Sequence, residues 1–177
     1  MIAVNVAQLL KAPVGTPRSF NFREIEPELS TELGIQGPLG GCVKLVRTSH
    51  GILVDCQYHV QIGQECGRCL GPTRCTLDAR FSQEFLPTTN VFSGLPEQIV
   101  ADPDEPRIDA NHVLDLTDVI RQDIVVQQPL QPLCRPDCAG LCAICGQDLN
   151  ETRCACEPAE ASGGLSRLGE LLKRELG

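Results

Sequence analysis

The sequence predicts an α+β protein. It would comprise a small antiparallel β-sheet or half-barrel core with a packed helix, then a cysteine-rich zinc-binding C-terminal segment and a terminal helix. Three observations predict this class: apolar residues alternate through the first ninety positions, a helical period follows residue 115, and six cysteines lie between residues 134 and 156. We expect a β-rich α+β domain at 1–130, and the cysteine-rich segment with the terminal helix at 131–177.

The core of the predicted domain must be aliphatic. Hydrophobic residues make up 42% of the 177 residues, but aromatic residues only 3%, with one Tyr and no Trp. A core of this composition depends on Val, Ile and Leu, which favour a sheet when they alternate with polar residues.

The β-sheet is predicted from segments of alternating character. Residues 1–6 form a short candidate strand, and residues 20–25 alternate more loosely. Residues 42–47 and 52–62 flank a turn at 49–51, which indicates a hairpin. In residues 74–86, Cys75, Leu77 and Phe81 fall on one side and charged residues on the other, which predicts one wet face.

The remaining elements are a long loop and two helices. Residues 87–111 are rich in Pro, Thr, Asn, Gly, Asp and Glu and predict an exposed loop with a short strand at 98–101. Residues 115–128 carry a helical pattern that Asp115 can cap and that Pro129 ends. Residues 162–176 predict an amphipathic helix with a leucine stripe.

The strongest functional signal is a group of six cysteines. Closely spaced thiolates suit Zn²⁺, and a Cys-x-x-Cys turn followed by Gly146 lets two sulfurs face one ion, with zinc–sulfur bonds of about 2.3 Å. All-cysteine sites are normally closed, which favours a structural ion over a catalytic one. The six candidate ligands are Cys134, Cys138, Cys142, Cys145, Cys154 and Cys156.

A further pair, Cys66 and Cys69, raises the number of candidate ligands to eight, enough for two four-cysteine sites. Two isolated cysteines at a strand end can equally be small apolar residues. The most compact quartet comprises residues 142, 145, 154 and 156, which leaves residues 66, 69, 134 and 138 for a second site. A single site that combines Cys134 or Cys138 with the 142/145 pair is an equal alternative.

Other uses of the cysteines are less favoured. The spacings do not follow ferredoxin patterns, which argues against an iron–sulfur cluster, and a redox dithiol is a further alternative. Cys42, Cys56 and Cys75 lack partners at ligand spacing, so we expect them to be buried in the β core.

Charge and motifs exclude several classes of function. The formal charge is −8, from 23 acidic and 15 basic residues, which opposes broad phosphate binding. A local basic face made of Arg68, Arg74, Arg135 and Arg153 stays open. The sequence contains no P-loop, Gly-x-Ser-x-Gly or His-Glu-x-x-His motif, and its three histidines suit ordinary surface roles, so we expect no enzyme.

The cell compartment follows from the N-terminus and from hydropathy. Residues 1–15 lack the basic start and long apolar run of a secretory signal, so we expect a cytoplasmic protein. No apolar run approaches the roughly 18 residues of a membrane-spanning helix. In the reducing cytoplasm, a dense cysteine cluster favours metal binding over disulfides.

The chain resembles the YceD family of large ribosomal RNA subunit accumulation proteins. The similarity rests on Cys66-Gly-Arg-Cys69-Leu70, on Leu114-Asp115-Leu116 at a helix start, and on the run from Leu133 to Asn150 followed by Cys154-x-Cys156. Ala143 stands where the family often has Pro, a departure that leaves the turn intact.

This resemblance implies a role in the accumulation or maturation of large-subunit ribosomal RNA without a known catalytic activity. The negative charge favours an adaptor that meets a basic ribosomal protein, an assembly factor or a processing enzyme. The rival hypotheses are a direct binder of precursor ribosomal RNA through its zinc knuckle and the four arginines, and a thiol-redox or metal-handling protein. We expect neither a membrane nor a small-molecule substrate as a partner.

Overall fold

The computed structural model describes residues 1–96 and 105–156. By its packing the chain divides into two compact units, which we describe separately. The first unit contains Met1–Glu65 and Pro72–Pro132, and the second contains Cys66–Gly71 together with the chain from Leu133 onward. The domain boundary at residue 130 therefore stays a prediction, since the second unit also takes in a turn from the middle of the chain.

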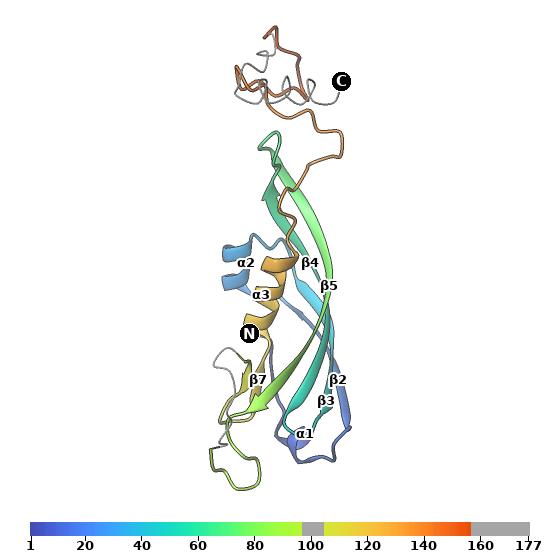
Figure 1. The fold of residues 1–177 in the computed structure, drawn as a ribbon, viewed down its shortest axis with the longest axis vertical. Coiled ribbons are helices and arrows are strands. Elements are labelled where there is room, and N and C mark those ends of the chain that lie inside the picture. Colours follow the sequence, from blue (N-terminus) through green and yellow to red (C-terminus); the bar gives the residue numbers. More distant parts are fainter. Residues whose placement is uncertain (97–104, 157–177) are drawn as a thin grey trace, which may run out of the picture. The chain divides into compact units, whose positions relative to one another are not determined.

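The first unit is built on a five-stranded sheet with the strand order β2-β3-β4-β5-β6 (Figure 1). The first four strands are antiparallel and follow one another along the chain, whereas β6 pairs in parallel with β5. This arrangement confirms the predicted α+β class with a mainly antiparallel sheet. The strands are β2 (Pro17–Glu24), β3 (Leu39–Arg47), β4 (Ile52–Glu65), β5 (Pro72–Pro87) and β6 (Arg107–Ile108).

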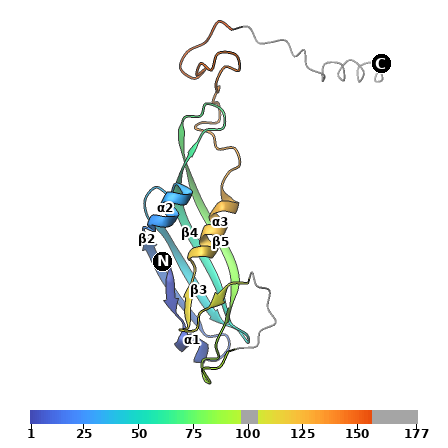
Figure 2. The ribbon, with the colours of Figure 1, turned by 90° about the vertical axis from the view of Figure 1, so that its left-hand side faces the viewer.

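Smaller elements complete the unit. Strand β1 (Ala3–Asn5) pairs with β7 (Val113–Asp115), and the short helices α1 (Ala7–Lys11) and α2 (Pro27–Leu33) flank the first long strand in sequence. Neither short helix was predicted from the sequence. The third helix, α3 (Thr117–Gln127), lies with α2 on one side of the sheet (Figure 2).

The predicted helix near residue 115 corresponds to α3. Asp115 precedes this helix by two residues, and its Oδ1 accepts hydrogen bonds from the Thr117 amide at 2.9 Å and from the Thr117 hydroxyl at 2.6 Å. The expected strand at 98–101 and the expected helix at 162–176 lie outside the described residues. No helix in the described part of the chain is long and apolar enough to cross a membrane.

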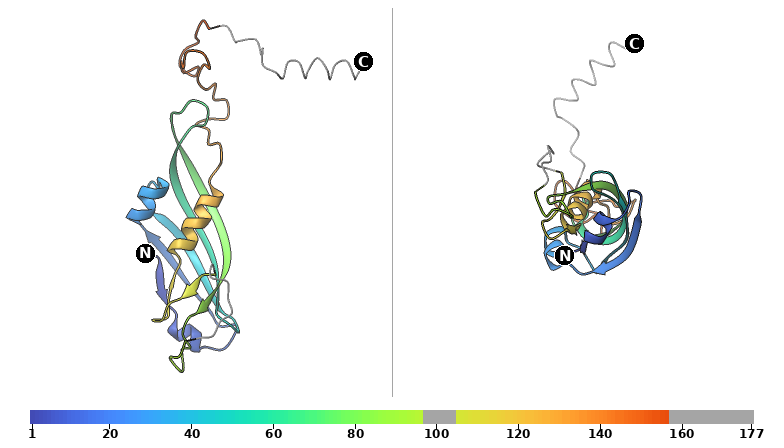
Figure 3. Two further views of the ribbon diagram at one scale, coloured as in Figure 1. Left: turned by 60° about the vertical axis from the view of Figure 1, so that its left-hand side comes forward. Right: turned by 90° about the horizontal axis from the view of Figure 1, so that it is seen from below.

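The core of the first unit lies between the curved sheet and α3 (Figure 3). Ile120 and Ile124 of α3 are fully buried, as are Val43 and Val54 of the sheet. The hydroxyl of Tyr58 donates a hydrogen bond of 2.5 Å to Asp123 Oδ2, which fastens the helix to β4. Burial and this hydrogen bond raise the pKa of Tyr58.

The outer face of the sheet is polar, and one of the three cysteines expected in the core lies on it. Cys42 is exposed rather than buried, because Val43 and Leu45 take the inward positions of β3 and neighbouring side chains point to opposite faces. Cys56 is buried as expected, and Cys75 is half-buried.

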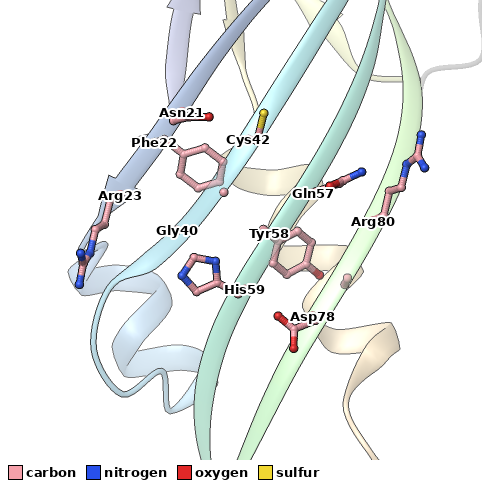
Figure 4. Close-up of a pocket in the computed structure, with 12 residues that line it drawn as sticks. Asn21, Phe22, Arg23, Gly40, Cys42, Gln57, Tyr58, His59, Asp78 and Arg80 are labelled. Carbon is pink, nitrogen blue, oxygen red and sulfur yellow. The ribbon is translucent and has the colours of Figure 1, made fainter.

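The same outer face contains a shallow hollow of about 820 Å³ (Figure 4). It lies over Gly40, where a Cβ atom would come within 2.6 Å of the His59 ring. Asp78 and Arg80 of β5 also line it, and both are exposed. We regard this hollow as part of the predicted wet face.

Candidate metal centres

The second unit brings all eight candidate cysteines into two groups. The four sulfurs of each group lie within 4.8 Å of one another, so each group could hold a metal ion. The first cluster comprises Cys66, Cys69, Cys134 and Cys138, and the second cluster comprises Cys142, Cys145, Cys154 and Cys156. Of the groupings that the sequence left open, this is the two-site arrangement.

The first cluster has the dimensions of a tetrahedral thiolate site. The sulfurs of Cys66 and Cys138 are 3.8 Å apart, and those of Cys69 and Cys134 are 3.7 Å apart. A disulfide bond is only about 2.05 Å long, so these thiols are not joined. A regular tetrahedron with metal–sulfur bonds of about 2.3 Å has edges of about 3.8 Å. The sulfur separations therefore match one tetrahedral ion.

A tight turn between β4 and β5 supplies two ligands of the first cluster. The amide of Cys66 donates to the carbonyl of Gly71 at 2.8 Å, and the amide of Leu70 donates to the carbonyl of Cys66 at 2.9 Å. Leu70 has a φ of 58°, in the left-handed region that non-glycine residues rarely adopt. The turn folds both sulfurs of the pair toward the same point.

The second cluster repeats this turn with a glycine at the left-handed position. The amide of Cys142 donates to the carbonyl of Gln147 at 2.8 Å, and the amide of Gly146 donates to the carbonyl of Cys142 at 2.9 Å. Gly146 follows the Cys-x-x-Cys turn, as the sequence indicated. Its φ is 73°, a left-handed conformation that glycine adopts without strain. The two Cys-x-x-Cys turns therefore have the same hydrogen-bond pattern at matching positions.

Backbone amides stabilise the first thiolate of each turn. The amides of Cys69 and Arg68 donate to the Cys66 sulfur and lower the pKa of Cys66 to about 6. In the second cluster, the amides of Cys145 and Ile144 lower the pKa of Cys142 to about 6. One sulfur in each cluster is thus prepared to be a thiolate, the form that binds metals.

One other sulfur in each cluster is held in the thiol form by its neighbours. Hydrogen bonding to Cys138 raises the pKa of Cys134 to about 12, and hydrogen bonding to Cys145 raises that of Cys156 to about 12. Neighbouring thiols share protons because adjacent thiolates repel one another. A bound metal ion would replace those protons, so this donor set fits a soft divalent cation.

The four arginines expected at an RNA or partner surface have different surroundings. The Arg68 guanidinium donates to the carbonyl of Cys138 at 2.9 Å, and Arg135 Nη2 donates to Asn150 Oδ1 at 2.7 Å. These two arginines therefore support the clusters. Arg153 is exposed in the second unit, and Arg74 is exposed on β5 of the first unit.

Sequence reasoning gave no role to two further residues of the second unit. Gly140 has a φ of 77°, and a Cβ atom there would lie 3.1 Å from the Arg68 carbonyl, so glycine allows the two segments to approach. The amide of Leu141 donates to that same carbonyl at 3.1 Å. Asn150 contacts the sulfur of Cys138 at 3.4 Å. Asn150 stands in the run that carries the family resemblance, but a sequence does not show which side chain reaches a ligand.

Fold and site together define an α+β protein with a cysteine-rich unit that could hold two metal ions. Comparison with known families agrees with this description. The chain belongs to the YceD family, described as large ribosomal RNA subunit accumulation protein, whose model matches residues 54–172. The match includes both clusters and confirms the resemblance seen in the sequence.

Individual relatives add little functional detail. An uncharacterized protein of Mycobacterium tuberculosis strain H37Rv is 29% identical over 107 residues, which is 60% of this chain and 49% of that protein. An uncharacterized protein of Mycobacterium leprae is 28% identical over 120 residues, or 63% of this chain and 49% of that protein. The chain thus spans about half the length of these curated relatives.

A maize protein named large ribosomal RNA subunit accumulation protein YCED homolog 1, chloroplastic, is 38% identical over 55 residues. These residues are 30% of this chain and 19% of the maize protein. No solved structure matches the chain.

Proposed function

We propose that this protein is a non-enzymatic, cytoplasmic ribosome-biogenesis factor needed for the accumulation or maturation of large-subunit ribosomal RNA. In this proposal it acts as a zinc-stabilised adaptor for a basic ribosomal or processing protein. Family membership supports the link to ribosomal RNA. The observation that carries the adaptor role is the charge balance of the second unit.

Within residues 66–71 and 133–156, three arginines are balanced by three acidic side chains. A divalent ion held by four thiolates carries a net charge of −2, so two loaded clusters would give this part of the chain a charge of −4. Two of the three arginines are already engaged within the unit, Arg68 by the Cys138 carbonyl and Arg135 by Asn150. Such a surface favours a basic protein over phosphates, because opposite charge steers the encounter.

Zinc is the metal that the donor set fits best. Four thiolates at tetrahedral spacing suit Zn²⁺, and a shell closed by four sulfurs leaves no position for a water or a substrate. The ion would supply folding free energy to a unit in which, among its described residues, only Cys66 and Cys138 are buried apolar side chains. Its role in this proposal is structural.

Metal content is the first test of the zinc sites. Elemental mass spectrometry on protein purified without added metal should find two zinc ions per chain, and one in the Cys66→Ser/Cys69→Ser variant. One zinc that is insensitive to this change would confine the metal to the second cluster. Iron or no metal would contradict the zinc assignment and favour the redox alternative.

Binding to purified large-subunit components tests the adaptor role. We expect the zinc-loaded protein to bind a basic ribosomal or processing protein and to bind bare precursor RNA weakly. The rival RNA-binding role predicts strongly salt-dependent RNA binding that weakens in Arg74→Gln/Arg153→Gln. These two arginines suit the test because they are exposed, whereas changes at Arg68 or Arg135 would also disturb the clusters.

A further inference from the structure

Asn150 lies in the loop between the two cysteine pairs of the second cluster, yet its side chain reaches a ligand of the first. Its Nδ2 donates to the Cys138 sulfur at 3.4 Å. Its Oδ1 accepts hydrogen bonds from the Ala139 amide at 2.8 Å and from Arg135 at 2.7 Å. The side chain is half-buried, and both ends of its amide are therefore engaged by the segment that carries Cys138.

The other connections of Asn150 lead into the second cluster. The backbone N–H of Asn150 donates to Asp148 Oδ1 at 2.8 Å, and its side-chain Nδ2 donates to the same oxygen at 2.7 Å. The amide of Thr152 donates to the Asp148 carbonyl at 3.1 Å, which closes the turn that leads to Cys154. Asp148 directly follows Gln147, whose carbonyl holds the Cys142 amide at 2.8 Å. Hydrogen bonds and adjoining residues of the chain therefore link a sulfur of one cluster to Cys142 and to the segment that leads to Cys154 in the other.

We propose that Asn150 is a positioning residue that couples the two clusters, so that metal bound at either one raises the metal affinity of the other. This inference rests on the proposed zinc sites. A metal holds Cys138 as a thiolate, and hydrogen bonds to a charged acceptor are stronger than those to a neutral thiol. Metal at the first cluster therefore fixes Asn150 and, through Asp148, the loop before Cys154.

The coupling arises because the loop has to be ordered only once. Fixing a residue costs conformational entropy, and the second ion to bind does not repeat that cost for residues already held by the first. By linkage the effect is reciprocal, and couplings of this kind are typically about 5- to 150-fold in affinity. Asparagine suits the position because it can donate to a sulfur and accept from an amide simultaneously.

The test is a titration of the metal-free protein, residues 1–177, with Co²⁺, under anaerobic conditions and against a competing chelator. Thiolate-to-cobalt absorption reports binding. The affinity of the first cluster is measured with the second cluster intact and after Cys142→Ser/Cys145→Ser. Both measurements are repeated with Asn150→Ala and with Asn150→Asp, which keeps the size of the side chain. Glu151→Gln is the matched control, because Glu151 is an exposed side chain in the same turn.

We expect loss of the second cluster to weaken the first by fivefold or more in the wild type and in Glu151→Gln, but by less than twofold in both Asn150 variants. Clusters that are independent in the wild type, or a coupling that survives both Asn150 changes, would overturn this inference and leave the zinc sites standing. A protein that binds no metal would overturn the zinc sites as well.

Discussion

A metal ion at the first cluster would close a long loop of chain. Cys69 and Cys134 are 65 residues apart in sequence, and the enclosed chain contains β5, β6, β7 and α3. A cross-link of this length restricts the unfolded first unit as a disulfide would. The chain-entropy relation for about 65 residues gives a stabilisation of about 4 kcal/mol. We therefore predict that Cys69→Ser/Cys134→Ser lowers the unfolding free energy of the first unit by about this amount.

Urea unfolding measures the effect. Tyr58 is the only tyrosine, the chain has no tryptophan, and Tyr58 is buried in β4, so its fluorescence reports on the first unit. With a slope of about 2 kcal/mol per molar urea, the midpoint should fall by about 2 M. A chelator should shift the wild type similarly.

The matched control is Cys142→Ser/Cys145→Ser, measured with excess zinc. The second cluster spans only residues 142–156, all of which belong to the second unit, so its loss leaves the large loop closed. Equal midpoints for both double variants, or no shift in either, would refute the loop-closure reasoning.

Three further predictions concern single side chains. Leu70→Gly should raise the stability of the metal-loaded second unit by up to about 1 kcal/mol, because Leu70 is 62% exposed and has a φ of 58°. The measurement is the temperature at which the metal is released. Gly146→Ala, the opposite change at the matching position of the other turn, should lower that temperature. Tyr58→Phe should lower the free energy of unfolding, measured by thermal denaturation, by about 1.5 kcal/mol, because it removes a hydrogen bond to the Asp123 carboxylate. A decrease below about 0.5 kcal/mol would show that this bond contributes little to stability. Arg80 lowers the pKa of Asp55, so the stabilisation from this pair should be present above the unfolded pKa near 3.8 and lost as the pH falls through the lower folded pKa. Asp55→Asn should accordingly reduce the melting temperature slightly at pH 7 and not at pH 2, and an equal loss at both pH values would contradict this.

The long strands could be predicted from sequence because alternation is a local property. In β5, Leu77 and Phe81 face inward as their spacing indicated, although Leu77 is buried and Phe81 only partly so. The expectation that Cys42 is buried was wrong, because the general preference of cysteine for burial does not fix which face of a strand it occupies. Its neighbours Val43 and Leu45 face the core, which puts Cys42 on the wet face. Helices α1 and α2 have only 5 and 7 residues, too few to show a helical period.

Membership of the two clusters was only partly accessible from sequence. Cys-x-x-Cys spacing marks a pair of sulfurs that face one ion, but spacing does not say which distant pair completes the site. Cys66 and Cys138 are 72 positions apart in sequence and are brought together by tertiary structure, which spacing does not encode. Asn150 was missed for the same reason, since its role depends on a contact with Cys138 across a turn.

The sequence separation within the first cluster also has a consequence for synthesis on the ribosome. Cys66 and Cys69 are made well before their partners, since 65 residues separate Cys69 from Cys134. At 5 to 20 residues per second, this is a delay of roughly 3 to 13 s, during which the thiol pair has no second pair to meet. The strands that precede this pair can form a hairpin in that interval. Metal capture at the first cluster would then follow the synthesis of every residue of the first unit, which ends at Pro132.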